Sequence, residues 1–231
     1  NKRVLLFLIE NKIIQFEKSI YEQIKTKRYC HFFYPEIKEF IGEKKGKSIE
    51  NELLSNDPNI FCDFNKKRHI GENDSYISSL IRQDSVETFI SYVTKNAIPL
   101  NANIKSSIFE TNIFLLDRVD ISLIEYSAFF GAIQIFQYLR MNGVELTSSL
   151  WLFAIHSQNA ELIHLLEYHE VNPQSIYYDE YYAPNNFEDP FIESIKCHHN
   201  NIAHYIEDNL APICNKKLDY SRFLSYILYN H

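Results

Sequence analysis

The chain has 231 residues, of which 45% are hydrophobic and 15% aromatic, and its formal net charge is −7. This length and hydrophobic content suffice for a buried core, which excludes an intrinsically disordered chain. The negative charge argues against a general nucleic-acid or anionic-membrane surface, because both depend on lysine and arginine neutralising phosphates. Five glycines and seven prolines, with helical periodicity and no polar–apolar alternation, predict an all-α fold.

The cysteines, Cys30, Cys62, Cys197 and Cys214, include no C-x-x-C pair. A chain of this length does not need a disulfide framework, so we interpret them as reduced thiols, which predicts an intracellular, cytoplasmic location. The apolar run at residues 4–9 is too short for the hydrophobic region of a signal peptide. No window approaches the roughly 18 apolar residues of a membrane span, so none is expected.

Residues 13–70 are predicted to form an irregular helical segment, preceded at 1–12 by the tail of a truncated repeat. Apolar residues at helical spacing favour a helix over residues 13–27. Pro35 can open a short helix that runs through Phe40. Because the apolar first helix would need a covering neighbour, we expect the natural protein to continue beyond at least one end of this sequence.

Residues 42–47 (GEKKGK) are predicted to be a solvated loop. A phosphate-binding loop needs four residues between its glycines, and only three separate this pair. Short helices are predicted over 48–54 and from the Asp57-Pro58 pair toward residue 67. We interpret the basic triplet at 66–68 as the solvated end of that helix, because import and nucleic-acid patches are usually longer.

The clearest pattern is at residues 122–145, SLIEYSAFFGAIQIFQYLRMNGVE. Ser122 can accept a hydrogen bond from the free N–H groups of a helix start, so it is predicted to cap a helix over 123–130. Gly131 can take a positive φ and end that helix, which allows a second helix over 133–141. Each helix has one apolar face, which it cannot bury alone.

The same template recurs along the chain. The N-cap positions are Ser75, Ser122, Ser149 and Asp189. The turn positions, nine residues further on, are Asp84, Gly131, Gln158 and His198. Self-similarity over units of this size predicts a repeat array. Its units are 75–97, 122–144, 149–171 and 189–210, followed by the start of a further unit at 219–231.

Three parts of the central unit carry a family resemblance, namely Ser122-Leu123-Ile124-Glu125, Ser127-Ala128 and Gly131-Ala132. They stand where an ankyrin repeat has Thr-Pro-Leu-His, an Ala-Ala pair and Gly-His. Asp189-Pro190-Phe191 is a closer copy of the start, with proline at the first helical position. The unit spacings of 47, 27 and 40 residues replace a regular period of about 33. This irregular, Asn- and Ile-rich chain resembles the divergent ankyrin-type families of parasitic protists such as trichomonads.

We therefore predict one ankyrin-like α-solenoid over residues 1–231, built of stacked helix–turn–helix pairs with irregular inserts. The predicted core between neighbouring pairs is Ile124, Ala128, Ile135, Phe136, Leu139, Trp151, Ala154, Ile163 and Leu166. Stacked repeats form an extended concave surface, so the predicted function is a protein–protein interaction scaffold. We expect a monomer that binds a partner protein through its loop tips and the exposed side of its first helices.

No enzymatic activity, cofactor, nucleic acid or small-molecule substrate is expected, because no catalytic motif is found. Two alternatives stay open. One is a structural spacer within a longer protein. The other is an unrecognised enzyme in the first 70 residues, which a convergent cleft of titratable groups would reveal.

Two histidine patterns raise the question of a metal site. Glu161 and His164 have the E-x-x-H spacing of di-iron bundles, but those sites need the motif twice and two further glutamates. Residues 197–199 (Cys-His-His) with His204 lack the paired ligand spacing of a closed tetrahedral zinc site. We therefore predict a surface role for the first pattern and turn chemistry for His198.

Two inserts interrupt the units. Residues 99–121 carry apolar side chains that are predicted to cover the stack, namely Ile108, Phe109, Phe114 and Leu115. In residues 172–188, the candidate partner-binding residues are Tyr177, Tyr178, Asp179, Glu180, Tyr181 and Tyr182. Exposed tyrosine anchors interfaces with little loss of entropy, and the two acids favour a basic partner. The alternative is an insert that folds back on the helices.

Overall fold

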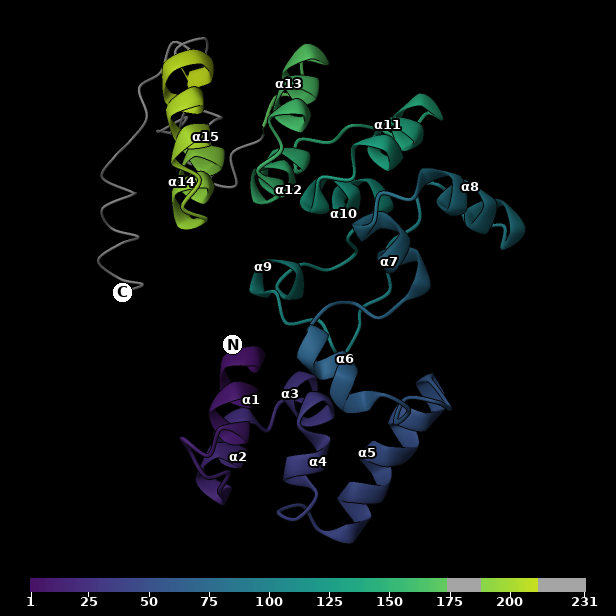
Figure 1. The fold of residues 1–231 in the computed structure, drawn as a ribbon, viewed down its shortest axis with the longest axis vertical. Coiled ribbons are helices and arrows are strands. Elements are labelled where there is room, and N and C mark those ends of the chain that lie inside the picture. The colour runs from purple at the N-terminus through teal and green to yellow at the C-terminus, as the bar shows by residue number, and fades with distance from the viewer. Residues whose placement is uncertain (174–187, 212–231) are drawn as a thin grey trace, which may run out of the picture. The chain divides into compact units, whose positions relative to one another are not determined.

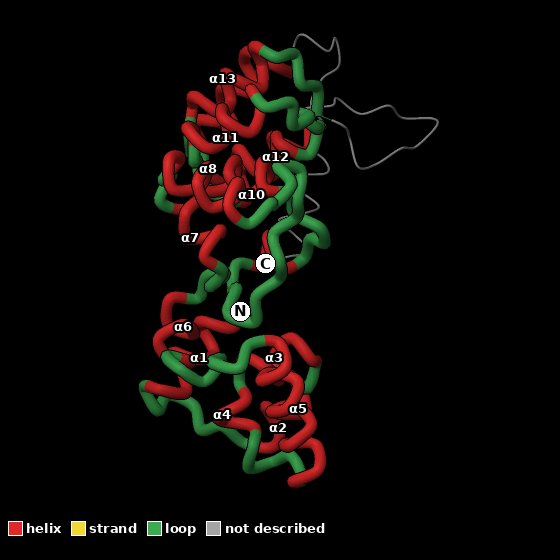
Figure 2. Tube along the Cα trace, turned by 90° about the vertical axis from the view of Figure 1, so that its right-hand side faces the viewer, coloured by secondary structure: helices red, strands yellow, loops and turns green. Residues whose placement is uncertain are grey.

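The computed structural model describes residues 1–173 and 188–211, and these are mostly helical. Over these ranges no β-strand is present, and the only extended pairing is an isolated bridge between Asn103 and Ser122 (Figure 2). The all-α prediction is therefore confirmed. The chain divides into two compact units, each of which is described below by itself.

The first unit comprises residues 1–76 and 105–120. Its helices are α1 (Lys2–Glu10), α2 (Lys18–Ile24), α3 (Lys27–Phe32), α4 (Tyr34–Ile37), α5 (Glu43–Asn56), α6 (Phe64–Ile70) and α9 (Ile113–Leu116) (Figure 1). Apolar side chains from the helices and their connections form one core. Its buried members are Leu6, Tyr21, Cys30, Phe32, Phe33, Ile37, Ile41, Ile49, Leu53, Ile60, Phe64 and Phe109.

Two cationic side chains are buried in this first unit. The Nζ of Lys2 donates to two backbone carbonyls of residues 105–120, at 2.9 and 3.0 Å, and lies over the Phe32 ring. The Arg68 guanidinium donates to both carboxylate oxygens of Glu36, at 2.7 and 2.8 Å, and also lies over the Phe32 ring. Carbonyl or carboxylate oxygens and an aromatic face thus replace the water that each cation loses.

Several local predictions for the first unit are wrong in their boundaries. Residues 43–47, predicted to be a loop, form the first turns of α5, which begins directly after Gly42. A helix was predicted over residues 13–27, but α2 begins only at Lys18, so residues 13–17 are not helical. Helix α4 ends at Ile37, three residues earlier than predicted, and the helix expected from residue 57 begins at Phe64.

Two further expectations fail because tertiary contacts override local pattern. Arg68, predicted to lie at a solvated helix end, is only 3% exposed. The insert predicted to cover the stack contributes Phe109 to the core of the first unit instead. It is held there by Thr111, whose N–H and hydroxyl donate to the Gly71 carbonyl at 3.1 and 2.7 Å.

The second unit comprises residues 77–104 and the described chain from residue 121 onward. Its helices follow one another as pairs. The first pair is α7 (Tyr76–Arg82) with α8 (Val86–Lys95), and the second is α10 (Leu123–Phe130) with α11 (Ile133–Met141). The third is α12 (Leu150–Ser157) with α13 (Ala160–Tyr168), and the fourth is α14 (Glu188–Lys196) with α15 (Asn200–Tyr205), which continues as a π-helical segment (Ile206–Leu210). These pairs lie at the four predicted ranges, but α14 begins at Glu188, so Asp189, predicted to be an N-cap, is already inside the helix.

The turn inside each pair has the same backbone conformation. Its left-handed residue is the one predicted from the register, with φ of 48°, 68°, 55° and 60° at Asp84, Gly131, Gln158 and His198. In three pairs the next N–H donates to the carbonyl five residues after the N-cap position. These bonds are Ser85 to Leu80, Ala132 to Ser127 and His199 to Ser194, at 3.1, 2.9 and 2.8 Å. A helix that ends through a left-handed residue is closed in this way.

The first helices of the second, third and fourth pairs stack on one another. Helix α12 packs between α10 and α14, and the second helices α8 and α11 are also in contact (Figure 1). The nine residues predicted to form the core between pairs are all buried. Trp151 is the largest of them, and its indole N–H donates to the Val171 carbonyl. The predicted packing of the second and third pairs is therefore confirmed.

Two carboxylates join one pair to the next. Asp84, at the turn of the first pair, accepts hydrogen bonds from two N–H groups at the start of α11, both at 3.0 Å. Glu125 accepts from the N–H of Ser122 at 2.9 Å, which completes a capping box, and from the Ser149 hydroxyl at 2.6 Å. Because orphan N–H groups at helix starts need acceptors, these contacts fix the register between pairs.

Candidate functional site

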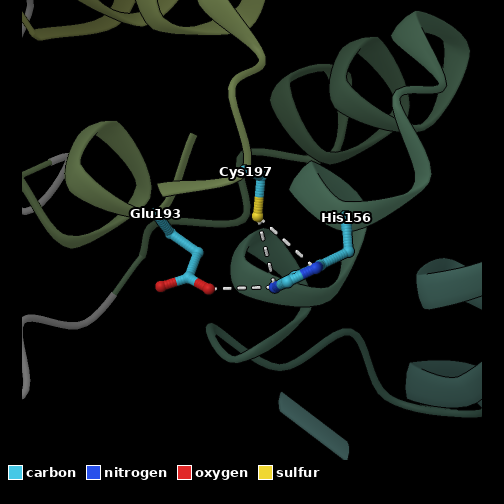
Figure 3. Close-up of side chains that lie close together, drawn as sticks. All are labelled: His156, Glu193 and Cys197. Carbon is cyan, nitrogen blue, oxygen red and sulfur yellow. Dashed lines mark hydrogen bonds and ion pairs between the residues drawn. The ribbon is translucent and has the colours of Figure 1, made fainter. Parts of the chain in front are cut away.

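His156, Glu193 and Cys197 form a cluster of polar side chains between the third and fourth pairs (Figure 3). His156 lies near the end of α12, Glu193 lies on α14, and Cys197 directly follows α14. One donor atom from each lies within 4.8 Å of the others. Within residues 1–173 and 188–211, no other grouping of three such side chains comes this close.

The stacking of the pairs explains why these residues meet. At two of the three interfaces between successive pairs, the residue seven positions after one predicted N-cap meets the residues four and eight positions after the next. Between the first and second pairs, Arg82 takes this place, donating to the Tyr126 hydroxyl at 3.0 Å and lying over the Phe130 ring. The same three positions in the third and fourth pairs hold the cluster. The repeat geometry therefore positions the three side chains.

His156 is the centre of the cluster. Its Nε2 lies 2.9 Å from Oε1 of Glu193, while the sulfur of Cys197 lies 3.5 Å from Nδ1 and 3.7 Å from Nε2 (Figure 3). Because the sulfur is almost equally far from both nitrogens, neither ring nitrogen directs its in-plane lone pair or N–H straight at it. The ring also stacks on Phe129 of the second pair, with centroids 5.0 Å apart.

The surroundings of the cluster shift the pKa values of two of its side chains, Glu193 and Cys197. Burial by itself would raise the pKa of Glu193, but the His156 hydrogen bond and the Lys196 ammonium, 3.4 Å from Oε2, outweigh it and hold that pKa below its usual range. Burial, reinforced by the Glu193 charge, raises the pKa of Cys197 to about 11. The cluster therefore holds a carboxylate beside a protonated thiol at neutral pH.

This protonation pattern bears on what the cluster can do chemically. A nucleophilic cysteine needs a depressed pKa, because the thiolate is the attacking species. The raised pKa of Cys197 disfavours that role. Imidazole nitrogen, cysteine thiolate sulfur and carboxylate oxygen are, however, the three donor types that bind zinc, and a bound metal ion itself lowers the pKa of its cysteine ligand. Metal coordination is therefore the chemistry that these donor atoms fit best.

The histidines considered from sequence are placed elsewhere. Glu161 and His164 are both exposed on α13, and His164 lies 3.5 Å from Glu167 of the same helix. His198 is the exposed left-handed residue of its turn, as predicted. The Cys197 side chain points toward His156, a residue that belongs to neither histidine pattern of the sequence. Aligning the first helices in register would have brought these two positions together.

The candidate partner-binding residues Tyr177, Tyr178, Asp179, Glu180, Tyr181 and Tyr182 lie outside the residues that the structure describes. The exposed side of the first helices, also predicted to bind, is small in the middle pairs. Every residue of α10 and α12 is buried or half-buried. Exposed apolar side chains are found instead at the ends of the second helices, where Met141 is 71% and Tyr168 is 79% exposed.

Comparisons of the chain with protein-family models, with curated proteins and with solved structures found no match. Over the described ranges, none of the helices has both the length and the apolar character needed to cross a membrane.

Proposed function

We propose that the second unit is an ankyrin-like solenoid that serves as a scaffold for binding a partner protein. The observation that carries this proposal is the common turn. Four positions in the same register, occupied by three different non-glycine residues and one glycine, all take a positive φ. A left-handed backbone is costly for residues with a Cβ, so its recurrence supports one repeated unit and not four unrelated helix pairs.

A scaffold function follows from what stacking does to the surface. Each pair contacts its neighbours along the array, so the second helices and turns form one long surface in which equivalent positions recur. Met141 and Tyr168 are such positions, each 19 residues after the N-cap position of its pair. Exposed methionine and tyrosine at equivalent positions of two neighbouring pairs suit recognition of an extended partner, because both residue types are enriched at interfaces.

The tyrosine-rich insert joins the third pair to the fourth, and we propose that it contributes to this recognition. Replacing both Tyr178 and Tyr181 with alanine should weaken partner binding by ~2 kcal/mol, or about 30-fold, without changing the melting temperature. Proximity labelling with the full-length protein supplies the partner, and calorimetric titration of the purified pair measures the affinity. The conservative Tyr178→Phe and Tyr181→Phe double variant, which keeps both rings, should retain most of the affinity.

Phe7→Ala is the matched control, because Phe7 is an exposed aromatic residue of the first unit, on α1. It should bind as the parent does. If the double alanine variant instead melts several degrees lower and binds with the parent affinity, the tyrosines stabilise the fold and the insert does not recognise the partner. A chain that captures no partner above the background of the labelling enzyme alone would favour a structural spacer.

A further inference from the structure

Nε2 of His156 lies at nearly the distances from the other two donor atoms that a tetrahedral zinc ion imposes. Bonds of about 2.0–2.1 Å to nitrogen and oxygen and about 2.3 Å to sulfur place N and O about 3.3 Å apart and N and S about 3.6 Å apart. Nε2 of His156 lies 2.9 Å from Oε1 of Glu193 and 3.7 Å from Sγ of Cys197. Of these two separations, the nitrogen–oxygen one must widen by a few tenths of an ångström, and the carboxylate oxygen lies within 4.8 Å of the sulfur.

We propose that His156, Glu193 and Cys197 form a zinc site that clamps the third helix pair to the fourth. The three donors are a borderline nitrogen, a soft sulfur and a hard oxygen, a mixture that suits Zn²⁺ better than Mg²⁺ or Ca²⁺, which prefer oxygen alone. Because His156 comes from α12, Glu193 from α14 and Cys197 from the position just after α14, the ion joins ligands that are 37 and 41 residues apart in sequence.

Binding requires a change in side-chain orientation. The His156 ring must rotate so that the Nε2 lone pair faces the space between the carboxylate and the sulfur, and the Cys197 thiol must release its proton to solvent. Lys196 lies near Oε2 of Glu193, and the oxygen nearest His156 is Oε1. The lysine can therefore remain paired with Oε2 while Oε1 coordinates the ion.

Three protein ligands leave a fourth tetrahedral position for water or for a donor from another molecule. The site does not depend on the proposed scaffold function. Zinc binding is measured on the isolated chain, whereas scaffold function is measured with a partner, so either proposal can fail alone.

The proposal is tested by titrating Zn²⁺ into the full chain, stripped of metal with a chelator, and measuring heat and stoichiometry. We expect one ion per chain and no binding of Mg²⁺. Cys197→Ala and Glu193→Gln should each weaken zinc binding by at least about tenfold, since even the loss of a residue that only hydrogen-bonds to a metal ligand can weaken binding by this factor. Cys62→Ser and Glu161→Gln are the matched controls, since both residues are exposed and lie outside the cluster, and they should bind as the parent does.

A second measurement uses the unaltered protein, so it holds even if a cluster variant fails to fold. One equivalent of Zn²⁺ should slow alkylation of Cys197, followed peptide by peptide in a mass spectrometer, and leave alkylation of Cys62 unchanged. Replacing zinc with Co²⁺ should produce a thiolate-to-metal charge-transfer band that persists in Cys62→Ser. The proposal is overturned if Cys197 reacts equally fast with and without zinc, or if the parent chain binds no zinc.

Discussion

Replacing Phe136 with alanine should lower the free energy of unfolding of the second unit by about 3–5 kcal/mol, the usual cost of removing a fully buried aromatic ring. Phe136 lies on α11 with no exposed surface, and Ile135 and Leu139 on the same helix are equally buried. The helix packs against α10 of its own pair and against α8 of the first pair. A cavity at Phe136 therefore weakens contacts both within a pair and between neighbouring pairs. Urea unfolding followed by circular dichroism measures the change.

The matched control for this variant is Met141→Ala on the same helix, because Met141 is largely exposed. Its effect should stay within about 0.5 kcal/mol, as for most surface substitutions. Equal losses of unfolding free energy for Phe136→Ala and Met141→Ala would mean that α11 does not pack as the structure shows.

Replacing Arg68 with methionine should destabilise the first unit by about 3–5 kcal/mol, because it leaves the Glu36 carboxylate without its cation in a buried setting. The guanidinium makes two bonds to Glu36 and also donates to the Phe32 carbonyl, at 3.2 Å. The Glu36 side chain is itself only 16% exposed, so water cannot fully replace the lost partner. Thermal unfolding of the variant and of the parent chain measures this loss of stability.

Two companion variants test this explanation. Lys66→Met, in the same basic triplet but exposed, should change stability by less than about 0.5 kcal/mol. Adding Glu36→Leu to Arg68→Met should recover part of the loss, because the second change removes the uncompensated charge. If the double variant is as unstable as the sum of the single ones, the two side chains are not energetically coupled.

The local features of the second unit were predictable from the sequence because local physical chemistry determines them. Ser122 and Glu125 form the capping box that their three-residue spacing permits, and Gly131 takes the left-handed conformation that suits a residue without Cβ. The register of these features then located Gln158 and His198 correctly, although neither residue type signals a left-handed turn as strongly as glycine does.

Long-range contacts decided the features that sequence patterns missed. Residues 42–47 looked like a loop because of their lysines and glycines, yet all but Gly42 belong to α5, whose Ile49 and Leu53 are buried in the core of the first unit. The contact between His156 and Glu193 spans 37 residues and exists only because α12 and α14 stack. No motif encodes such a contact, although the repeat register places both residues at facing positions.

The central claim, that the pairs repeat one unit with a common left-handed turn, is tested most directly at His198. This exposed residue has a φ of 60°, so His198→Gly should remove backbone strain and raise the free energy of unfolding by about 0.5–1 kcal/mol. The same change at His204, inside α15, should lower it by about 1 kcal/mol, because glycine destabilises a helix interior. Opposite signs at these two histidines are the result that the common turn requires. A loss of stability at both would contradict it.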